Sequence, residues 1–180
     1  MSQSVYKVHH AIKCIDLIQE QIVRHPTLRP VVLLLKMILL KHGLNQPYSG
    51  GLNSYSLVLM ATAFLQNLGI KDSISKNLRE FLRFFGVYFD PHHCMIRDHQ
   101  LLQDNSILLT ESMTVYDPLN AANNVTRTAF RIQDIKMLFT QTYEQIVQNE
   151  AKFKAIYEHH NMQQIINEFQ NVIVELTFNN

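Results

Sequence analysis

The stretch from Leu28 to Gln66 constrains the fold of this chain more than any other. Its first part is an apolar run with one lysine near its middle, and it is too short and too charged to cross a bilayer. A second apolar run, Leu57–Leu65, follows a connection rich in Asn, Pro, Ser and Gly, which are the residues that favour turns. The pattern predicts two buried core helices joined by a loop. Pro30 falls in the first turn of the first helix, where a missing N–H costs little.

The composition indicates one globular domain over residues 1–180. At 47% hydrophobic and 17% charged residues, the chain can bury a sizeable core without disulfides or metal. A formal net charge of +1 argues against a self-sufficient nucleic-acid binder with a strongly basic face. Cys14 and Cys94 lack CxxC spacing, and no secretory signal or transmembrane segment is visible. We therefore expect a reduced, intracellular protein without membrane contacts.

Helical periodicity recurs on both sides of this stretch. Isoleucines between Ile12 and Ile22 line one side of a helix that should end near Arg24. The segment Leu78–Phe85 has apolar residues at i, i+3, i+4 and i+7, and Gly86 is expected to close that helix. Two further helical stretches are expected at residues 135–147 and 153–173.

A small β element is expected between these helices. The runs Met95–Leu102 and Ile107–Thr110 flank the polar tripeptide Gln103-Asp104-Asn105, which predicts a β-hairpin whose turn lacks glycine. Val115–Tyr116 is expected to add a short strand. The predicted fold class is therefore mainly α, with a small β-hairpin as a minor component.

Two blocks of the sequence resemble one protein family. The block Leu28–Met60 has the pattern LRPxVLxLKxxLLxxGLNxPYSGGLxSYSLVLM, which is similar to the central, PAP-associated domain of the noncanonical poly(A) polymerases. These are terminal nucleotidyltransferases that tail RNA. The block Val115–Phe130, VYDPLNAANNVTRTAF, is similar to the loop by which that family reads the nucleotide base. The resemblance covers the whole chain and implies a helical central domain.

The catalytic carboxylates of that family have no counterpart in this sequence. Nucleotidyl transfer needs acids that hold two divalent ions, and the family supplies them as a D-x-D pair after a Gly-Ser turn, with a third acid further on. The 15 Asp and Glu residues here include no D-x-D, and no Gly-Ser dipeptide occurs. We therefore expect no catalytic residue in this chain. We expect the catalytic domain to be missing from this chain, with Mg²⁺ or Mn²⁺ only on that missing half.

Three residues of the first block match nucleotide contacts of the family. Lys36 matches a lysine that reaches the terminal phosphates of the nucleotide; alternatively, it is a snorkelling lysine or part of a buried ion pair. A second family lysine falls on Leu40 here. Ser54 and Tyr55 match a Ser-Tyr pair at a helix start, where free N–H groups attract phosphate and a ring stacks on a base. Without the resemblance they would be a helix cap and a core residue.

The second block contributes the candidates for base recognition. Asn123, Asn124 and Arg127 follow the family pattern D-P-x-x-x-x-N-D-V-G-R, although Asn124 replaces the usual aspartate and Thr126 the usual glycine. An amide offers a donor and an acceptor to an adenine edge, whereas an Asx-rich surface turn needs no ligand. Family members that select uridine have a histidine in or beside this loop. None occurs here, which favours adenosine.

Four other residues raise the question of a zinc site. His92, His93, Cys94 and His99 are close in sequence. Their spacing fits no standard ligand set, and adjacent histidines rarely bind one ion well. We expect no metal site at these residues.

These features predict the nucleotide- and base-binding half of a poly(A) polymerase-like enzyme that is inactive alone. The resemblance implies ATP as substrate and an RNA 3′ end as acceptor, reached through a complex. It also implies a catalytic domain or chain, an RNA-binding protein and a helicase as partners, and a nuclear location with the cytoplasm as alternative. The other hypothesis is a catalytically dead homologue that serves as a protein-interaction scaffold in an RNA-processing complex. Lys36, Ser54 and Tyr55 favour nucleotide binding. The altered Asn124 and Thr126, together with the second lysine that is lost, favour the scaffold.

Overall fold

The computed structural model describes residues 3–69, 73–104, 106, 108–109 and 112–159 of the chain. It forms two compact units, Met1–Gln141 and Thr142–Asn180. The described strands all belong to the first unit, and the described part of the second unit is the end of the last helix. No helix among the described residues is long and apolar enough to span a membrane.

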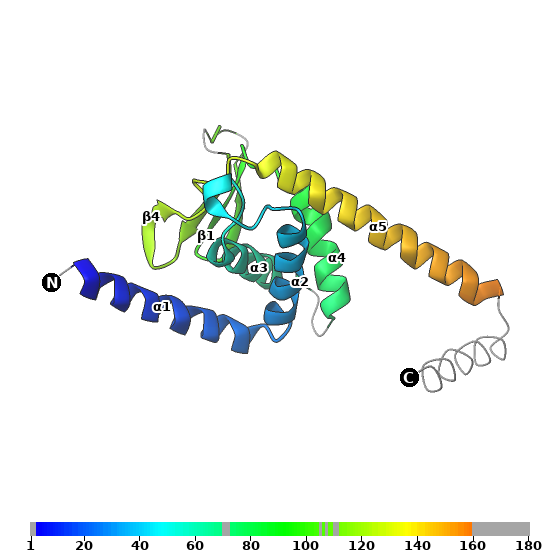
Figure 1. The fold of residues 1–180 in the computed structure, drawn as a ribbon, viewed down its shortest axis with the longest axis horizontal. Helices are drawn as coiled ribbons and strands as arrows, with labels where there is room; N and C mark the ends of the chain where they lie inside the picture. The colour runs from blue at the N-terminus through cyan, green and yellow to red at the C-terminus, as the bar shows by residue number, and fades with distance from the viewer. Residues whose placement is uncertain (1–2, 70–72, 105, 107, 110–111, 160–180) are drawn as a thin grey trace. The chain divides into compact units, whose positions relative to one another are not determined.

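The helices lie close to where periodicity predicts them. Asn53 caps α3 by accepting a hydrogen bond from the backbone N–H of Ser56 at 2.7 Å, and Ser73 caps α4 through the N–H of Lys76 at 3.4 Å. The helices and helical turns are α1 (Gln3–Arg24), α2 (Leu28–Lys41), η1 (Pro47–Ser49), α3 (Ser54–Leu68), α4 (Ile74–Arg83), η2 (Phe84–Tyr88) and α5 (Ile132–His159) (Figure 1). The expected helix at 153–173 lies mostly outside the described residues.

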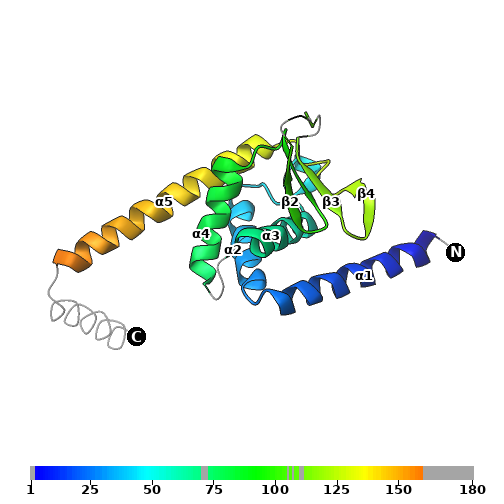
Figure 2. The ribbon, with the colours of Figure 1, turned by 180° about the vertical axis from the view of Figure 1, so that it is seen from behind.

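The strands form one mixed sheet in the order β2-β1-β3-β4. The strands are β1 (Cys94–Arg97), β2 (Gln100–Gln103), β3 (Thr114–Asp117) and β4 (Asn120–Asn124). β1 pairs antiparallel with β2 and parallel with β3, and β3 pairs antiparallel with β4. Figure 2 shows β2 and β4 at the two sides of the sheet.

The expectation of a mainly α fold with a minor hairpin is therefore wrong, because the four-stranded mixed sheet makes this an α+β fold. The hairpin also lies elsewhere than expected. Its strands pair from Cys94 to Gln103, and its turn is Asp98-His99, with positive φ values of 48° and 60°. A two-residue turn with both φ values positive matches the twist of paired strands, and Asp and His tolerate this conformation better than most residues.

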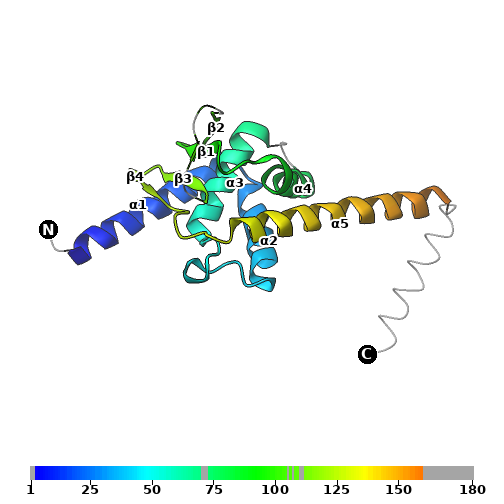
Figure 3. The ribbon, with the colours of Figure 1, turned by 90° about the horizontal axis from the view of Figure 1, so that it is seen from above.

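Helix α3 is the centre of the first unit. It contacts α2, α4, β2 and β3, and Figure 3 shows it between the strands and α2. Its segment Leu59–Leu65 is buried throughout. At one end a cluster of phenylalanine rings packs edge-on or tilted, with Phe64 5.5 Å and Phe139 5.8 Å from Phe81 between ring centroids. Such ring pairs add to the stabilisation from buried apolar area.

The end of α4 differs from the prediction that Gly86 closes the helix. The chain continues from Arg83 into a π-helical turn, Phe84–Tyr88, that contains Gly86. A Cβ atom at Gly86 would lie 2.7 Å from the backbone N of Thr140, so glycine is required for the close approach of α5. The π turn places Phe85 and Phe89 together, with ring centroids 5.1 Å apart.

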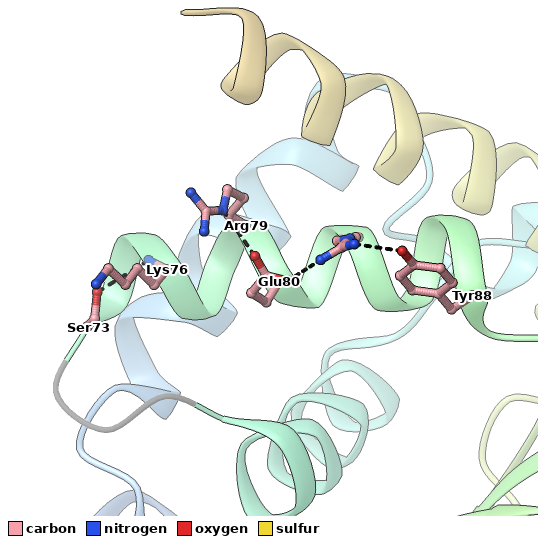
Figure 4. Close-up of polar contacts among 6 residues, drawn as sticks. Ser73, Lys76, Arg79, Glu80 and Tyr88 are labelled. Atoms are coloured by element: carbon pink, nitrogen blue, oxygen red, sulfur yellow. Dashed lines mark hydrogen bonds and ion pairs between the residues drawn. The ribbon is translucent and has the colours of Figure 1, made fainter. Parts of the chain in front are cut away.

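A row of polar contacts follows the outer side of α4 into this turn (Figure 4). Glu80 accepts from Arg79 at 3.1 Å and from Arg83 at 3.4 Å. Arg83 also donates to the Tyr88 hydroxyl at 2.7 Å, and its guanidinium lies 5.1 Å from that ring's centroid. These side chains are partly exposed, so each contact contributes modestly to the free energy of unfolding.

Helix α2 is buried on one side only, which the apolar run did not predict. Its buried residues are Leu28, Val31, Val32, Leu35 and Leu39. The opposite side is apolar but exposed, and it includes Leu33, Met37 and Leu40 at 51%, 65% and 62% exposure. Lys36 is exposed on this helix as well, so it is neither a buried ion pair nor an unpaired buried charge.

Candidate functional site

An open pocket of about 410 Å³ lies where the start of α3 meets the β3–β4 hairpin. It brings together residues far apart in sequence, including Tyr55 from α3 and Asn123 and Arg127 from the hairpin and the segment after it. Its lining residues are Cys14, Asn53, Tyr55, Asp117, Asn123, Asn124, Val125, Arg127 and Thr128. Four of the six candidate site residues thus lie in one depression.

Asp117 connects the polar groups of this pocket through its carboxylate. Its side chain is 1% exposed, and Oδ1 accepts hydrogen bonds from the Tyr55 hydroxyl at 2.8 Å and from the N–H of Leu119 at 3.0 Å. Oδ2 accepts from the Asn123 amide at 3.3 Å. One carboxylate therefore fixes both the aromatic ring and the amide that the sequence assigned to base contact. The sequence pattern did not mark Asp117 itself as a site residue.

The environment of Tyr55 keeps its hydroxyl protonated. Burial, followed by the hydrogen bond to Asp117, raises the pKa of Tyr55 far above its ordinary value. Cys14 of α1 also interacts with this hydroxyl, and burial raises the pKa of its thiol too. The ring is thus a neutral, fixed surface at the edge of the pocket, as stacking on a base requires.

Asn53 joins the start of α3 to the hairpin. Its Oδ1 caps the helix, while its Nδ2 donates to the carbonyl of Val125 at 3.1 Å. The positive end of the α3 dipole is therefore held next to the pocket, which favours an anionic group there. Ser54, which the sequence matches to a phosphate contact at the start of this helix, is exposed at the first helical position. It does not cap the helix.

Asn124 and Thr126 form a buried network beneath the pocket. Asn124 donates through Nδ2 to the carbonyl of Met113 at 2.9 Å and accepts through Oδ1 from the N–H groups of Val115 and Thr126, both at 3.0 Å. The Thr126 hydroxyl is 3.0 Å from the carbonyl of Met113. The two departures from the family pattern thus interact with each other, and Asn124 braces the loop with its amide.

Lys36 and Arg127 complete the set of candidates. Lys36 is exposed on α2 and is not among the residues lining the pocket. Arg127 lines the pocket and is exposed, so its guanidinium is available to an anion in solvent. The structure brings Tyr55, Asn123, Asn124 and Arg127 together, with Ser54 next to them in the chain and Lys36 apart.

No zinc site is formed in the described structure by the four residues with zinc-ligand side chains, which are His92, His93, Cys94 and His99. Among the described residues, no group of three or more His, Cys, Asp or Glu side chains is arranged to hold an ion. His93 instead pairs with Asp90 at 2.7 Å, and that hydrogen bond lowers the pKa of the Asp90 carboxyl. His99 lies in the hairpin turn, with its Nδ1 buried and without a hydrogen bond to the described part of the chain.

The α+β fold is shared with solved structures of polymerases that act on RNA. The chain superposes on the polymerase core of TRAMP, an RNA surveillance complex, with a TM-score of 0.66 and 25% sequence identity, over 75% of this chain and 47% of that one. A cytoplasmic RNA terminal U-transferase shares the fold, with a TM-score of 0.54 at 19% identity, over 68% of this chain and 53% of that one.

Curated relatives agree with this class. Poly(A) RNA polymerase protein 2 of Saccharomyces cerevisiae is 26% identical over 153 residues, which are 75% of this chain and 26% of that protein. The inactive non-canonical poly(A) RNA polymerase protein Trf4-2 of Drosophila melanogaster is 36% identical over 91 residues, or 46% of this chain and 22% of that protein. The chain is thus homologous to non-canonical poly(A) RNA polymerases. No protein-family model matches it.

The match covers only part of each relative. The chain spans about a quarter of the length of the curated relatives, at 26% and 22%, and about half of the solved chains, at 47% and 53%. The activities of those whole proteins are therefore proposals for this chain.

Proposed function

We propose that this chain is the nucleotide- and base-binding half of an RNA terminal nucleotidyltransferase that transfers AMP from ATP to an RNA 3′ end. The observation that carries the proposal is the pocket in which the Tyr55 ring and the Asn123 amide are held by the same buried carboxylate, Asp117. A ring fixed beside an amide can stack on an adenine and read its edge. The absence of D-x-D in the sequence supports a binding role without catalysis.

Each candidate has a role in this proposal. Tyr55 stacks on the base, and Asn123 donates to or accepts from its edge. Arg127 and the start of α3 at Ser54 attract the triphosphate, because both are positive and reachable from solvent. Asn124 acts through the loop that it braces. Lys36 contacts the terminal phosphates only if they extend beyond the pocket towards α2.

Chemistry at the reacting phosphate belongs to a catalytic domain or chain that carries Mg²⁺ or Mn²⁺. Carboxylates of that domain or chain would hold two ions, and these would supply activation of the attacking hydroxyl and neutralisation of the charge on the triphosphate. The residues of the pocket bind and orient the nucleotide. The RNA acceptor would be reached through a complex, since the structural relative is the polymerase core of an RNA surveillance complex. An RNA-binding protein and a helicase are the partners that we propose for that complex. A nuclear site of action is part of this proposal.

Substitution of Tyr55 tests the proposal. Tyr55→Ala should weaken ATP binding by roughly ten- to a hundredfold, because a stacking contact is worth on the order of 1–3 kcal/mol. Tyr55→Phe keeps the ring and should bind within about threefold of the unmodified chain, while losing on the order of 1 kcal/mol of folding stability with the hydrogen bond to Asp117. Ligand-observed NMR titration suits the weak affinity expected of one half of a site.

Tyr48→Ala is the matched control, because Tyr48 is 85% exposed and outside the pocket. It should leave ATP binding unchanged. Titration with UTP under the same conditions tests the choice of base, and adenosine should be preferred. If the unmodified chain, Tyr55→Phe and Tyr55→Ala bound ATP with equal affinity, the proposed nucleotide site would be wrong.

The scaffold remains the second candidate because α2 exposes an apolar side. Leu33, Met37 and Leu40 lie on it at 51%, 65% and 62% exposure, and surfaces of this kind mark contacts with other proteins. A scaffold requires no nucleotide affinity. The Tyr55 titration therefore decides between the two functions, since only the binding half responds to removal of the ring.

A further inference from the structure

Three side chains form a row across the face of the sheet opposite to α3. Gln100 of β2 is the direct partner of Arg97 in β1, so their side chains lie on the same face. The parallel register pairs Ile96 with Val115, which places Tyr116 of β3 beside Arg97. Ile96 and Val115 are buried on the other face, whereas Gln100 and Arg97 are exposed and Tyr116 is half-buried.

Arg97 and Tyr116 form a preorganised pair within this row. The guanidinium carbon of Arg97 lies 4.2 Å from the centroid of the Tyr116 ring, which is a close cation–π contact. Within the described part of the chain, this guanidinium has no carboxylate partner. Arg83, which also lies over a tyrosine ring, is by contrast paired with Glu80. Arg97 thus presents a planar cation to solvent with its donors uncommitted.

We propose that the row Gln100–Arg97–Tyr116 binds single-stranded RNA upstream of its 3′ end, an inference that rests on the proposed function. A guanidinium held flat on a ring offers its second face to a nucleobase and its edge donors to a phosphate oxygen. Gln100 adds an amide at the end of the row. The next residue of β3, Asp117, bonds to Tyr55 of α3 and faces the nucleotide pocket, so a strand held on this row lies on the other face of the sheet from the pocket.

The charges around the row favour RNA over an acidic peptide. Asp98, in the turn between β1 and β2, is exposed and places a negative charge beside Gln100. A carboxylate there opposes a purely electrostatic ligand. Stacking of a base on the guanidinium plane does not depend on the net charge of the surface around the row. The row therefore suits a ligand that has both bases and phosphates.

The experiment measures binding of a fluorescent oligoadenylate to the whole 180-residue chain by anisotropy over a range of salt concentrations. Arg97→Ala should weaken binding roughly tenfold and reduce the slope of log K against log salt by about 0.7, the value for one phosphate contact with a single strand. Arg97→Lys keeps the charge and loses the plane, so it should restore the slope but only part of the affinity. Tyr116→Phe should bind like the unmodified chain.

Arg29→Ala is the matched control, since Arg29 is an exposed arginine on α2 outside the row. An equal loss of RNA binding in the Arg29 and Arg97 variants would overturn the inference, as would full recovery with Arg97→Lys or no RNA binding by the unmodified chain. Melting temperatures within a few degrees of each other show that the variants fold. ATP titration of Arg97→Ala should be unchanged, so failure of the RNA site and failure of the nucleotide pocket are read separately.

Discussion

The amide of Asn124 bonds to three different backbone groups, on Met113, Val115 and Thr126. It is 8% exposed, so these bonds replace water that the side chain has lost. The sequence makes Asn124 a candidate for base contact that departs from the aspartate of the family pattern. The structure instead shows that the residue change is matched by its neighbour Thr126, which shares the acceptor on Met113.

Restoring the aspartate of the family pattern should therefore destabilise this chain. Asn124→Asp removes the only donor to the Met113 carbonyl from this side chain and leaves a buried carboxylate facing a carbonyl oxygen. We expect a loss of about 1–3 kcal/mol in the free energy of unfolding at neutral pH, measured by urea denaturation. Asn120→Asp is the control, because Asn120 is exposed on the same strand and uses only an acceptor, towards the N–H of Ala122. Equal stability of the two variants would contradict the role of the network.

At the scale of elements, the helices and the short strand at Val115–Tyr116 could be predicted, whereas β4 and the order of the sheet could not. Spacing of apolar residues and the caps at Asn53 and Ser73 locate the helices because these signals are local. β4 has the sequence NAANN, which has low strand propensity, and it forms because it pairs with β3. The hairpin turn Asp98-His99 lacks glycine and so gave no turn signal. Asp117 escaped notice as a site residue because its hydrogen bond to Tyr55 joins positions 62 residues apart.

The hairpin turn should make the stability of the fold depend on pH. Burial lowers the pKa of His99 below 6.5, and burial lowers that of His25 at the end of α1 as well. Groups with lowered folded pKa values stabilise the fold fully above the unfolded pKa, and this contribution is lost as the pH falls through the folded pKa. The melting temperature should therefore fall as the pH is lowered from about 7.5 to below about 6.

His99→Gln should reduce this dependence while keeping the side chain polar. The remaining slope should come from His25, so the double variant with His25→Gln should be flatter still. Circular dichroism melts at several pH values measure the effect. A slope unchanged in both variants would place the titrating group elsewhere. Glu20, Arg24 and Asp98 also act on His99, so these variants are compared at constant salt concentration.

At the scale of the whole molecule, the proposed function makes this chain the nucleotide-binding half of a reaction site. The described residues provide a pocket with a ring, an amide and a cation, and the sequence provides no carboxylate pair for two ions. The purified chain, with ATP, Mg²⁺ and an RNA primer, should therefore show no extension of the primer on a denaturing gel. Primer extension that persists through repeated purification would contradict the assignment of chemistry to another domain or chain.

The π turn at Phe84–Tyr88 has a consequence for how this fold tolerates changes in length. A π turn accommodates one more residue than an α turn, and single-turn π segments inside helices often mark such an addition. Here the extra residue sets Phe89 next to Phe85 and leaves Val87 and Tyr88 at 49% and 58% exposure. Deleting one of the two exposed residues would convert the turn to α geometry and rotate Phe89 out of the aromatic cluster. The helix would still form after such a deletion, but the residues after the turn would be shifted by one helical position. The segment from Phe89 into β1 would then enter the sheet from a different direction.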